Sequence, residues 1–157
     1  TFAVCDAKTG YTLQTLVNDG TSGNTEASLM NTVKPHLNQN AILYADNFFF
    51  TSAIIKTLMD KKTLFVGTAR FDRLPAGIKK KYKKDSVKKW KKGLSSGVRG
   101  PELPGVVFTF VRDSAAVCFV SSNPDTNDVG TVMRMMKDGK KLPFYYPLVL
   151  LMYNNFM

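Results

Sequence analysis

Cysteine and histidine are scarce in this 157-residue chain, which has two cysteines and a single histidine, His36. Cys5 and Cys118 each lie in an apolar run, which is typical of small buried side chains in a reducing compartment. No CxxC pair occurs, so we expect no zinc site built from these ligands. A glycine-rich phosphate loop is absent, and Ser95 and Ser96 have no histidine nearby in the sequence. A nucleotide-binding enzyme and a serine hydrolase are therefore not indicated.

Long hydrophobic runs are also missing. The most apolar segment, residues 143–157, is interrupted by Pro147, and its run of about a dozen residues is too short to span a bilayer. We expect this segment to form a strand or the start of a helix that docks on the core. The chain begins at Thr1 inside an apolar run, without an initiator methionine or a signal-peptide pattern. We therefore expect a piece of a longer protein.

Acidic residues are few, since 12 Asp and Glu stand against 22 Lys and Arg and give a net charge of +10. Residues 73–92 hold ten basic residues against one acid, Asp85, and so carry +9 of this charge. Tyr82 and Trp90 are interleaved with the lysines, which indicates phosphate contacts combined with base stacking. The alternatives are a solvated loop and a nuclear-import signal. The candidate nucleic-acid-binding residues are Lys79, Lys80, Lys81, Lys83, Lys84, Lys88, Lys89, Trp90, Lys91 and Lys92.

Two aspartates each follow a short apolar run. Asp6 follows residues 1–5 (TFAVC) and Asp46 follows residues 41–45 (AILYA), runs that are consistent with buried strands. A helical pattern over residues 26–37 lets the second strand return parallel to the first by a right-handed crossover. Ligands of open α/β sheets collect at the carboxyl ends of such strands. Two carboxylates side by side there either raise each other's pKa or recruit a divalent cation.

The residues alone leave a structural alternative open. Asp6 begins the sequence DAKTG, which is typical of a turn between two strands, and Asp46 with Asn47 precedes a helix that either side chain can cap. Asp113 also lies in a tight turn, where a structural role is favoured over a functional one.

Four blocks of sequence resemble piggyBac-type transposases and occur in the order of that family. Residues 44–70 (YADNFFFTSAIIKTLMDKKTLFVGTAR) resemble the segment that carries the family's second catalytic aspartate, and residues 4–13 (VCDAKTGYTL) resemble the first catalytic segment. Residues 111–122 (VRDSAAVCFVSS) resemble a strand pair of the family, and residues 147–157 (PLVLLMYNNFM) resemble the stretch that runs into its Tyr-Asn-x-x-Met motif. Ordered matches that bracket nearly the whole chain are poorly explained by chance.

The resemblance implies a ribonuclease H-like core that cuts and joins DNA with two divalent ions. Asp6 and Asp46 match the first and second catalytic acids and are the expected ligands of Mg²⁺ or Mn²⁺. The resemblance further implies DNA as the partner, a homodimer of the full-length protein and a nuclear location, without a membrane or a small-molecule cofactor. The family's third acid follows a Gly-Gly-Val-Asp that comes after the methionine matched by Met157, so neither Asp128 nor Asp138 is assigned to that role.

The expected fold class is α/β, a ribonuclease H-like mixed sheet with flanking helices plus a β-rich insertion. The expected early elements are strands over residues 1–6, 11–17, 41–45 and 63–69 and helices over residues 25–37 and 51–60. The chain is divided into a ribonuclease H-like catalytic core half (1–70), a basic connection (71–105), a β-rich insertion (106–142) and a return segment toward the missing third acid (143–157).

Three functions remain open at this point. The first is a fragment of a DNA transposase, which we expect to be inactive alone because the third acid is missing. The second is a domesticated, transposable element-derived protein that binds DNA or chromatin without cutting it. The third is an unrelated basic α/β module whose lysines serve a membrane surface or another acidic partner.

Overall fold

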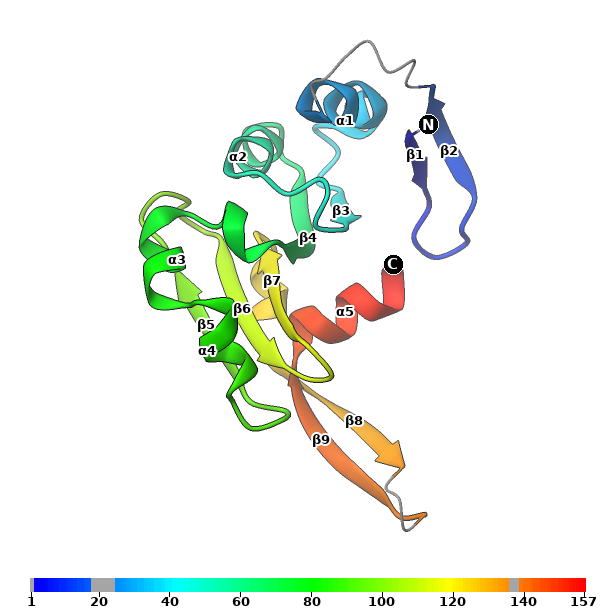
Figure 1. The fold of residues 1–157 in the computed structure, drawn as a ribbon. Helices are drawn as coiled ribbons and strands as arrows, with labels where there is room; N and C mark the ends of the chain where they lie inside the picture. The colour runs from blue at the N-terminus through cyan, green and yellow to red at the C-terminus, as the bar shows by residue number, and fades with distance from the viewer. Residues whose placement is uncertain (1, 18–24, 136–138) are drawn as a thin grey trace.

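The computed structural model describes residues 2–17, 25–135 and 139–157 (Figure 1). Its strands are β1 (Phe2–Cys5), β2 (Thr12–Leu16), β3 (Ile42–Ala45), β4 (Leu64–Ala69), β5 (Ser95–Arg99), β6 (Val107–Arg112), β7 (Ala116–Ser121), β8 (Val129–Met135) and β9 (Lys141–Pro147). Its α-helices are α1 (Thr25–Val33), α2 (Ser52–Asp60), α3 (Ala76–Lys81), α4 (Lys84–Lys88) and α5 (Leu148–Phe156). Short 3-10 turns cover Lys34–His36, Phe71–Arg73 and Pro124–Asn127.

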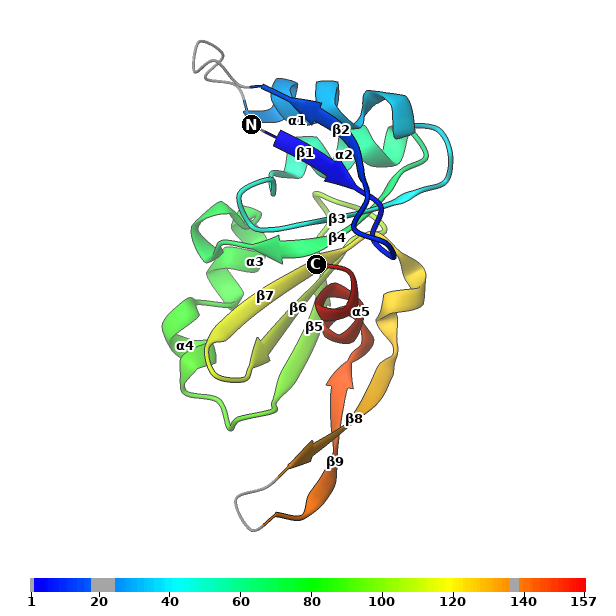
Figure 2. The same ribbon diagram turned by 90° about the vertical axis from the view of Figure 1, so that its right-hand side faces the viewer.

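The central sheet has five strands in the order β3-β4-β7-β6-β5. Strands β3 and β4 are parallel, as a crossover through α2 requires, whereas β4, β7, β6 and β5 pair antiparallel. Two further two-stranded sheets stand beside it, a β1–β2 hairpin and a β8–β9 ribbon. The ribbon projects away from the rest of the molecule (Figure 2). The predicted mixed sheet with flanking helices is confirmed.

The expected insertion strands are part of the central sheet. Strand β7 pairs with β4 through Gly67 and Val120, and β6 then pairs with β7. Strands β3 and β4, from the first 70 residues, therefore share one hydrogen-bonded layer with β6 and β7, which follow residue 106. The division of the chain into four segments stays a prediction.

The early elements match the expected pattern, with one helix shorter than predicted. Helix α1 ends at Val33 and a 3-10 turn follows, because Pro35 has no N–H to continue the helical hydrogen bonds. Within the basic connection, for which no helix or strand was predicted, the structure has two short helices, α3 and α4, and strand β5. The last segment forms the end of β9 and then α5.

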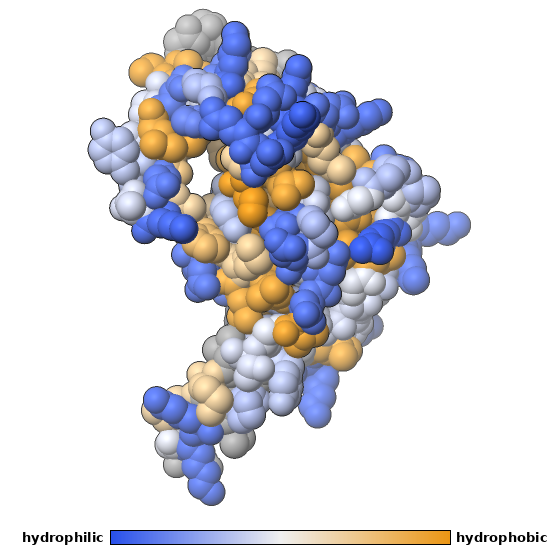
Figure 3. All heavy atoms as spheres, turned by 180° about the vertical axis from the view of Figure 1, so that it is seen from behind, coloured by the Kyte–Doolittle hydropathy of each residue, from blue (hydrophilic) through white to orange (hydrophobic). Residues whose placement is uncertain are grey.

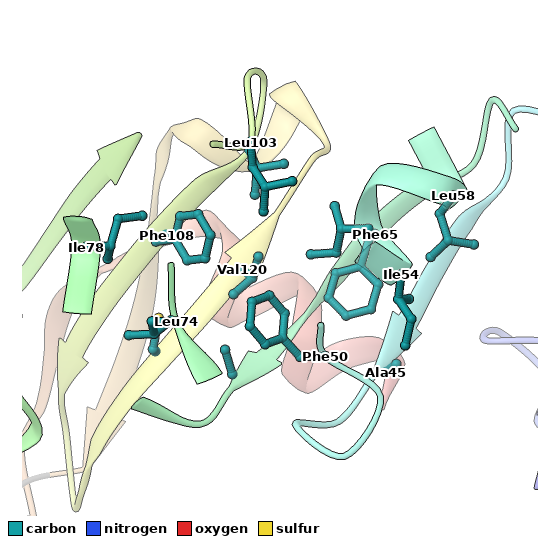
Figure 4. Packing of buried hydrophobic residues seen from close by; sticks show 14 of the residues in the cluster. Ala45, Phe50, Ile54, Leu58, Phe65, Leu74, Ile78, Leu103, Phe108 and Val120 are labelled. Atoms are coloured by element: carbon teal, nitrogen blue, oxygen red, sulfur yellow. The ribbon is translucent and has the colours of Figure 1, made fainter. Parts of the chain in front are cut away.

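Buried side chains fill both faces of the central sheet. On one face, Ile54 and Leu58 of α2 pack with Phe65 of β4, and Phe108 of β6 packs with Ile78 of α3 (Figure 4). On the other face, α5 covers the sheet through a separate cluster formed by Val66, Val111, Phe119, Tyr146, Val149 and Leu150. Successive side chains along each strand point to opposite faces of the sheet, so β3, β4, β6 and β7 contribute to both clusters.

Candidate functional site

Asp46 begins a tight turn at the end of β3. Its Oδ1 accepts a hydrogen bond from the N–H of Phe48 at 2.9 Å, and its carbonyl accepts from the N–H of Phe49 at 3.3 Å. Helix α2 is capped by Thr51, whose hydroxyl accepts from the N–H of Ile54 at 3.1 Å. Asp46 is therefore not needed as the helix cap. Within the described part of the chain, its Oδ2 has no hydrogen bond, and the side chain is only half-buried.

Gly67 on β4 allows this strand to pack closely against the end of β3, just before the Asp46 turn. A Cβ atom at residue 67 would collide with the carbonyl oxygen of Ala45, the residue before Asp46, and with the ring of Phe65. Glycine is therefore the residue that lets β4 lie close to the last residue of β3. The side chain of Phe50 is fully buried and holds the other end of the turn in the core.

Asp6 forms the turn of the β1–β2 hairpin. Its Oδ1 accepts hydrogen bonds from the hydroxyl of Thr9 at 2.8 Å, the N–H of Thr9 at 2.8 Å and the N–H of Lys8 at 3.1 Å. The Thr9 hydroxyl, followed by the Thr9 N–H, lowers the pKa of the Asp6 carboxyl. The structural role foreseen for this residue is thus present, and all three bonds use one oxygen. Its Oδ2 has no hydrogen bond from the described residues.

The structure does not bring β1 and β3 into one sheet. Among the described residues, β1 pairs only with β2 and β3 only with β4. The ring of Phe2, at the start of β1, lies 5.6 Å from that of Phe49 and 6.3 Å from that of Phe48. Four residues of strand span about 13 Å, so Asp6 lies at the far end of β1 from this contact. The space-filling view shows a small opening beside the hairpin, which otherwise contacts α1 and the body of the molecule (Figure 3). The assignment of both acids to one site stays a prediction.

A hollow of about 610 Å³ lies beside the Asp46 turn. Asn47, Arg70, Asp72 and Lys84 contribute polar groups to its lining. Arg70 and Asp72 form a two-bond ion pair there, with Nε–Oδ1 at 3.2 Å and Nη2–Oδ2 at 3.1 Å. The hollow therefore connects the residue after Asp46 with the first lysine of α4.

The lysine run forms a basic surface on two anchored helices. Every lysine from Lys79 to Lys92 is exposed, whereas Ile78 of α3 and Val87 of α4 are buried in the core. The apolar residues fix the helices on the sheet, and the lysines point outward as a consequence. We call this surface, residues 79–92, the lysine face.

The two aromatic rings of the run pack inward. Tyr82 stacks on Phe110 with the ring centroids 4.3 Å apart and the planes 4° from parallel, and its hydroxyl lies 3.1 Å from the Ser96 hydroxyl. Trp90 is half-buried and meets Tyr82 edge to face at 6.3 Å. One face of Tyr82 is therefore occupied by the core, and a nucleic-acid-binding role for Trp90 stays a prediction.

Sequence reasoning missed Arg73 as part of this site. Its Nη1 donates to the carbonyls of Phe48 at 3.1 Å and Asn47 at 3.4 Å, which ties the segment after β4 to the Asp46 turn. No pattern around Arg73 signals this bond, because the partners are backbone atoms 25 and 26 residues away.

The two cysteines differ. Cys118 is buried, and burial raises the pKa of its thiol far above the ordinary value. Cys5 is exposed, contrary to expectation, because nothing among the described residues covers the outer face of β1. No group of three or more His, Cys, Asp or Glu side chains within residues 2–17, 25–135 and 139–157 is placed to hold a metal ion. The same residues contain no helix long and apolar enough to cross a membrane.

Comparison with known proteins agrees with this architecture. The family described as Transposase IS4 matches residues 1–157, the whole chain. A search of curated proteins found no match. A cryo-EM structure of a piggyBac transposase synaptic complex with hairpin DNA is similar to this chain with a TM-score of 0.67 and 18% sequence identity.

That similarity covers 97% of this chain and 30% of the piggyBac chain, so this chain spans about a third of the relative's length. The shared fold confirms the predicted ribonuclease H-like class. The chain belongs to the Transposase IS4 family, in its piggyBac type.

Proposed function

We propose that this chain is part of the catalytic domain of a DNA transposase that cuts and joins DNA strands with divalent ions. The observation that carries the proposal is the hollow lined by both Asn47 and Lys84, which links the Asp46 turn to the lysine face. A DNA strand held by the lysines would run along this hollow to Asn47, the residue next to Asp46. The family match over the whole chain supports the same chemistry.

The donor atoms on this chain suit a hard divalent cation. Asp6 and Asp46 each engage only Oδ1 in the turn bonds described above, which leaves Oδ2 for a ligand. Mg²⁺ is bound by one or two carboxylates while it keeps several waters. When bound, a pair of such ions activates the attacking water or 3′-hydroxyl and stabilises the leaving oxygen. Asp6 and Asp46 orient the ions in this proposal, and their Oδ1 bonds fix the two carboxylates.

If Asp6 and Asp46 bind the same ion, the β1–β2 hairpin must bring Asp6 close to Asp46. Mg²⁺–oxygen distances are about 2.1 Å, so both carboxylates must approach within a few ångströms of the same point. Strand β3 is an edge strand of the central sheet, and its outer edge is unpaired in the described structure. We propose that the β1–β2 hairpin aligns along this edge in the active protein, and that a further acid of the whole transposase completes the ion-binding set.

Titration with Mn²⁺ tests the metal assignment. We expect paramagnetic broadening of the backbone signals around Asp46 and Asp6, and loss of the broadening around Asp46 in Asp46→Asn. Asp6→Asn weakens the Asp46 broadening only if one ion bridges both residues, which makes it the test of the shared site. Broadening confined to Asp113 or Asp125 would refute the assignment.

The lysine face is tested by charge removal. We expect replacement of Lys79, Lys80, Lys81, Lys83 and Lys84 by glutamine to weaken binding to duplexes of any sequence. The slope of log affinity against log salt should flatten by about 0.9 for each phosphate that is no longer neutralised. A matched control removes five other exposed lysines, Lys8, Lys34, Lys56, Lys61 and Lys62. Equal weakening in both variants, or a sequence-dependent weakening, contradicts a backbone-contacting face.

Strand cleavage tests the reaction itself. We expect no nicking of a labelled duplex by the 157-residue chain alone, because two carboxylates do not fix the geometry between two ions. The whole transposase should nick element ends, and Asp46→Asn should abolish this while the fold is kept. An inactive whole protein with all its acids present would favour the domesticated, DNA-binding function. The homodimer and the nuclear location stay predictions of the family.

A further inference from the structure

The β8–β9 ribbon projects from the molecule, and its base is packed against the rest of the protein. Its two strands pair in continuous antiparallel register from Val129 opposite Pro147 to Met135 opposite Lys141. At the base, Tyr146 is 1% exposed, and a Cβ atom at Gly130 would collide with Leu151 of α5. The N–H of Leu148 also donates to the Asp128 carbonyl at 2.8 Å. The ribbon therefore leaves the core at a fixed point and extends into solvent (Figures 1 and 2).

One face of the ribbon is apolar and uncovered. Met133, Met135 and Tyr145 are 56%, 64% and 70% exposed. The register sets Met133 opposite Pro143 and Tyr145 opposite Thr131, so these residues share one side of the ribbon. The space-filling view shows weakly hydrophobic residues on the projecting arm, with hydrophilic residues at its outer part (Figure 3).

The ribbon carries a net positive charge. Residues 129–147 contain Arg134, Lys137, Lys140 and Lys141 and one acid, Asp138. Lys140 and Lys141 are exposed and lie at the outer end, next to the apolar face. Together with the lysine face, the ribbon carries the chain's positive charge, because the remaining residues are close to neutral. A polyanionic partner complements the net positive charge of the ribbon and the lysine face, whereas an apolar protein surface does not.

We propose that the β8–β9 ribbon is a second DNA-contacting arm, which lies in a groove of duplex DNA with Lys140 and Lys141 on the phosphates and Met133 and Tyr145 toward the bases. The major groove, about 12 Å wide, admits a two-stranded ribbon, and apolar side chains contact thymine methyl groups there. The proposal rests on the proposed function, which makes DNA the substrate. It adds a contact that is separate from the lysine face.

Salt-dependent binding of the 157-residue chain to a duplex tests the phosphate contacts. Lys140→Gln with Lys141→Gln should flatten the log–log salt slope by up to about 1.8, or 0.9 for each contact. The matched control is Lys61→Gln with Lys62→Gln, an exposed adjacent pair after α2, which should leave the slope unchanged. An equal slope for the wild-type and ribbon variants overturns the proposal. Absence of duplex binding by the wild-type chain would instead count against the proposed function as a whole.

A photo-crosslink tests the apolar face. Benzoylphenylalanine in place of Tyr145 should crosslink to a labelled duplex under ultraviolet light, and the same group in place of Val17, 77% exposed on the other hairpin, should not. Both sites are on the surface, so the fold is kept. Crosslinks from residue 145 to a second copy of the chain, with none to DNA, would overturn the proposal.

Discussion

In the proposed function, the lysine face binds DNA and the β1–β2 hairpin carries the first catalytic acid, Asp6. The two regions differ in how extensively they are packed against the core. Beneath the lysine face, Ile78 is 3% exposed, Val87 is fully buried and Tyr82 stacks on Phe110. The hairpin contacts α1 and the main core through half-buried residues such as Val4 and through the ring of Phe2.

The outer sides of these regions differ as well. The lysine face is charged and suited to solvent, whereas the hairpin exposes apolar residues, with Tyr11 at 72%, Leu13 at 47% and Val17 at 77%. In the proposed function, the anchored basic helices would present their DNA contacts in a fixed position. The first acid instead depends on where its hairpin lies, and we infer that hairpin placement controls whether Asp6 and Asp46 can share an ion.

The largest expected effect comes from removing the anchor of the lysine face. Phe110→Ala deletes a fully buried ring that contacts both Tyr82 and Phe71, and we expect the free energy of unfolding to fall by about 3–5 kcal/mol. Urea unfolding measures this decrease, and hydrogen exchange should show faster opening of α3 and α4. Unchanged exchange in these helices would show that the lysine face does not depend on this stack.

A smaller destabilisation is expected at the junction of β3 and β4. Gly67→Ala forces a methyl group against the Ala45 carbonyl and the Phe65 ring, which should cost about 1–3 kcal/mol and displace the Asp46 turn. Gly97→Ala on β5 is the matched control, because its Cβ would meet only ordinary contacts, the nearest at 3.7 Å. Equal stability of the two variants in urea would contradict the close approach.

The sequence predicted the elements whose apolar spacing matches their structure. Ile54, Ile55 and Leu58 recur at helical spacing and are fully buried in α2, which Thr51 caps. Strand β5 was missed because SSGVR has little apolar alternation and is held mainly by its pairing with β6. Helices α3 and α4 were missed because the single buried residues Ile78 and Val87 are hidden among lysines.

The local structure around each candidate residue could be predicted from the sequence, but the relative positions of these residues could not. The turn chemistry of Asp6 could be read from DAKTG, because Thr9 lies within hydrogen-bonding reach along the chain. The distance between β1 and β3 depends on tertiary contacts such as that of Phe2 with Phe49, which no local pattern specifies. The bond from Arg73 to the Asp46 turn has the same long-range origin.

The hairpin anchor should be weaker than the anchor of the lysine face. Phe2→Ala removes the ring contacts with Phe48 and Phe49, and we expect the free energy of unfolding to fall by about 0.5–1.5 kcal/mol. Hydrogen exchange should rise in residues 2–17 and stay unchanged in α3 and α4. A decrease as large as that of Phe110→Ala would show that the hairpin is as firmly held as the helices.

The smallest effect concerns the pH dependence of the hairpin turn. Because the folded-state pKa of Asp6 is lowered, chiefly by the Thr9 hydroxyl, its ionised form stabilises the turn. This stabilisation is present above the unfolded value of about 3.9 and is lost as the pH falls through the lowered pKa. In a titration followed by NMR, the amide signals of Lys8 and Thr9 should move with a midpoint below about 3.9, the ordinary pKa. Thr9→Val should raise this midpoint, and Asp6→Asn should remove the step. A midpoint at or above the ordinary pKa of aspartate would mean that these hydrogen bonds do not hold the carboxylate, and the turn would then leave Asp6 free to reorient toward Asp46.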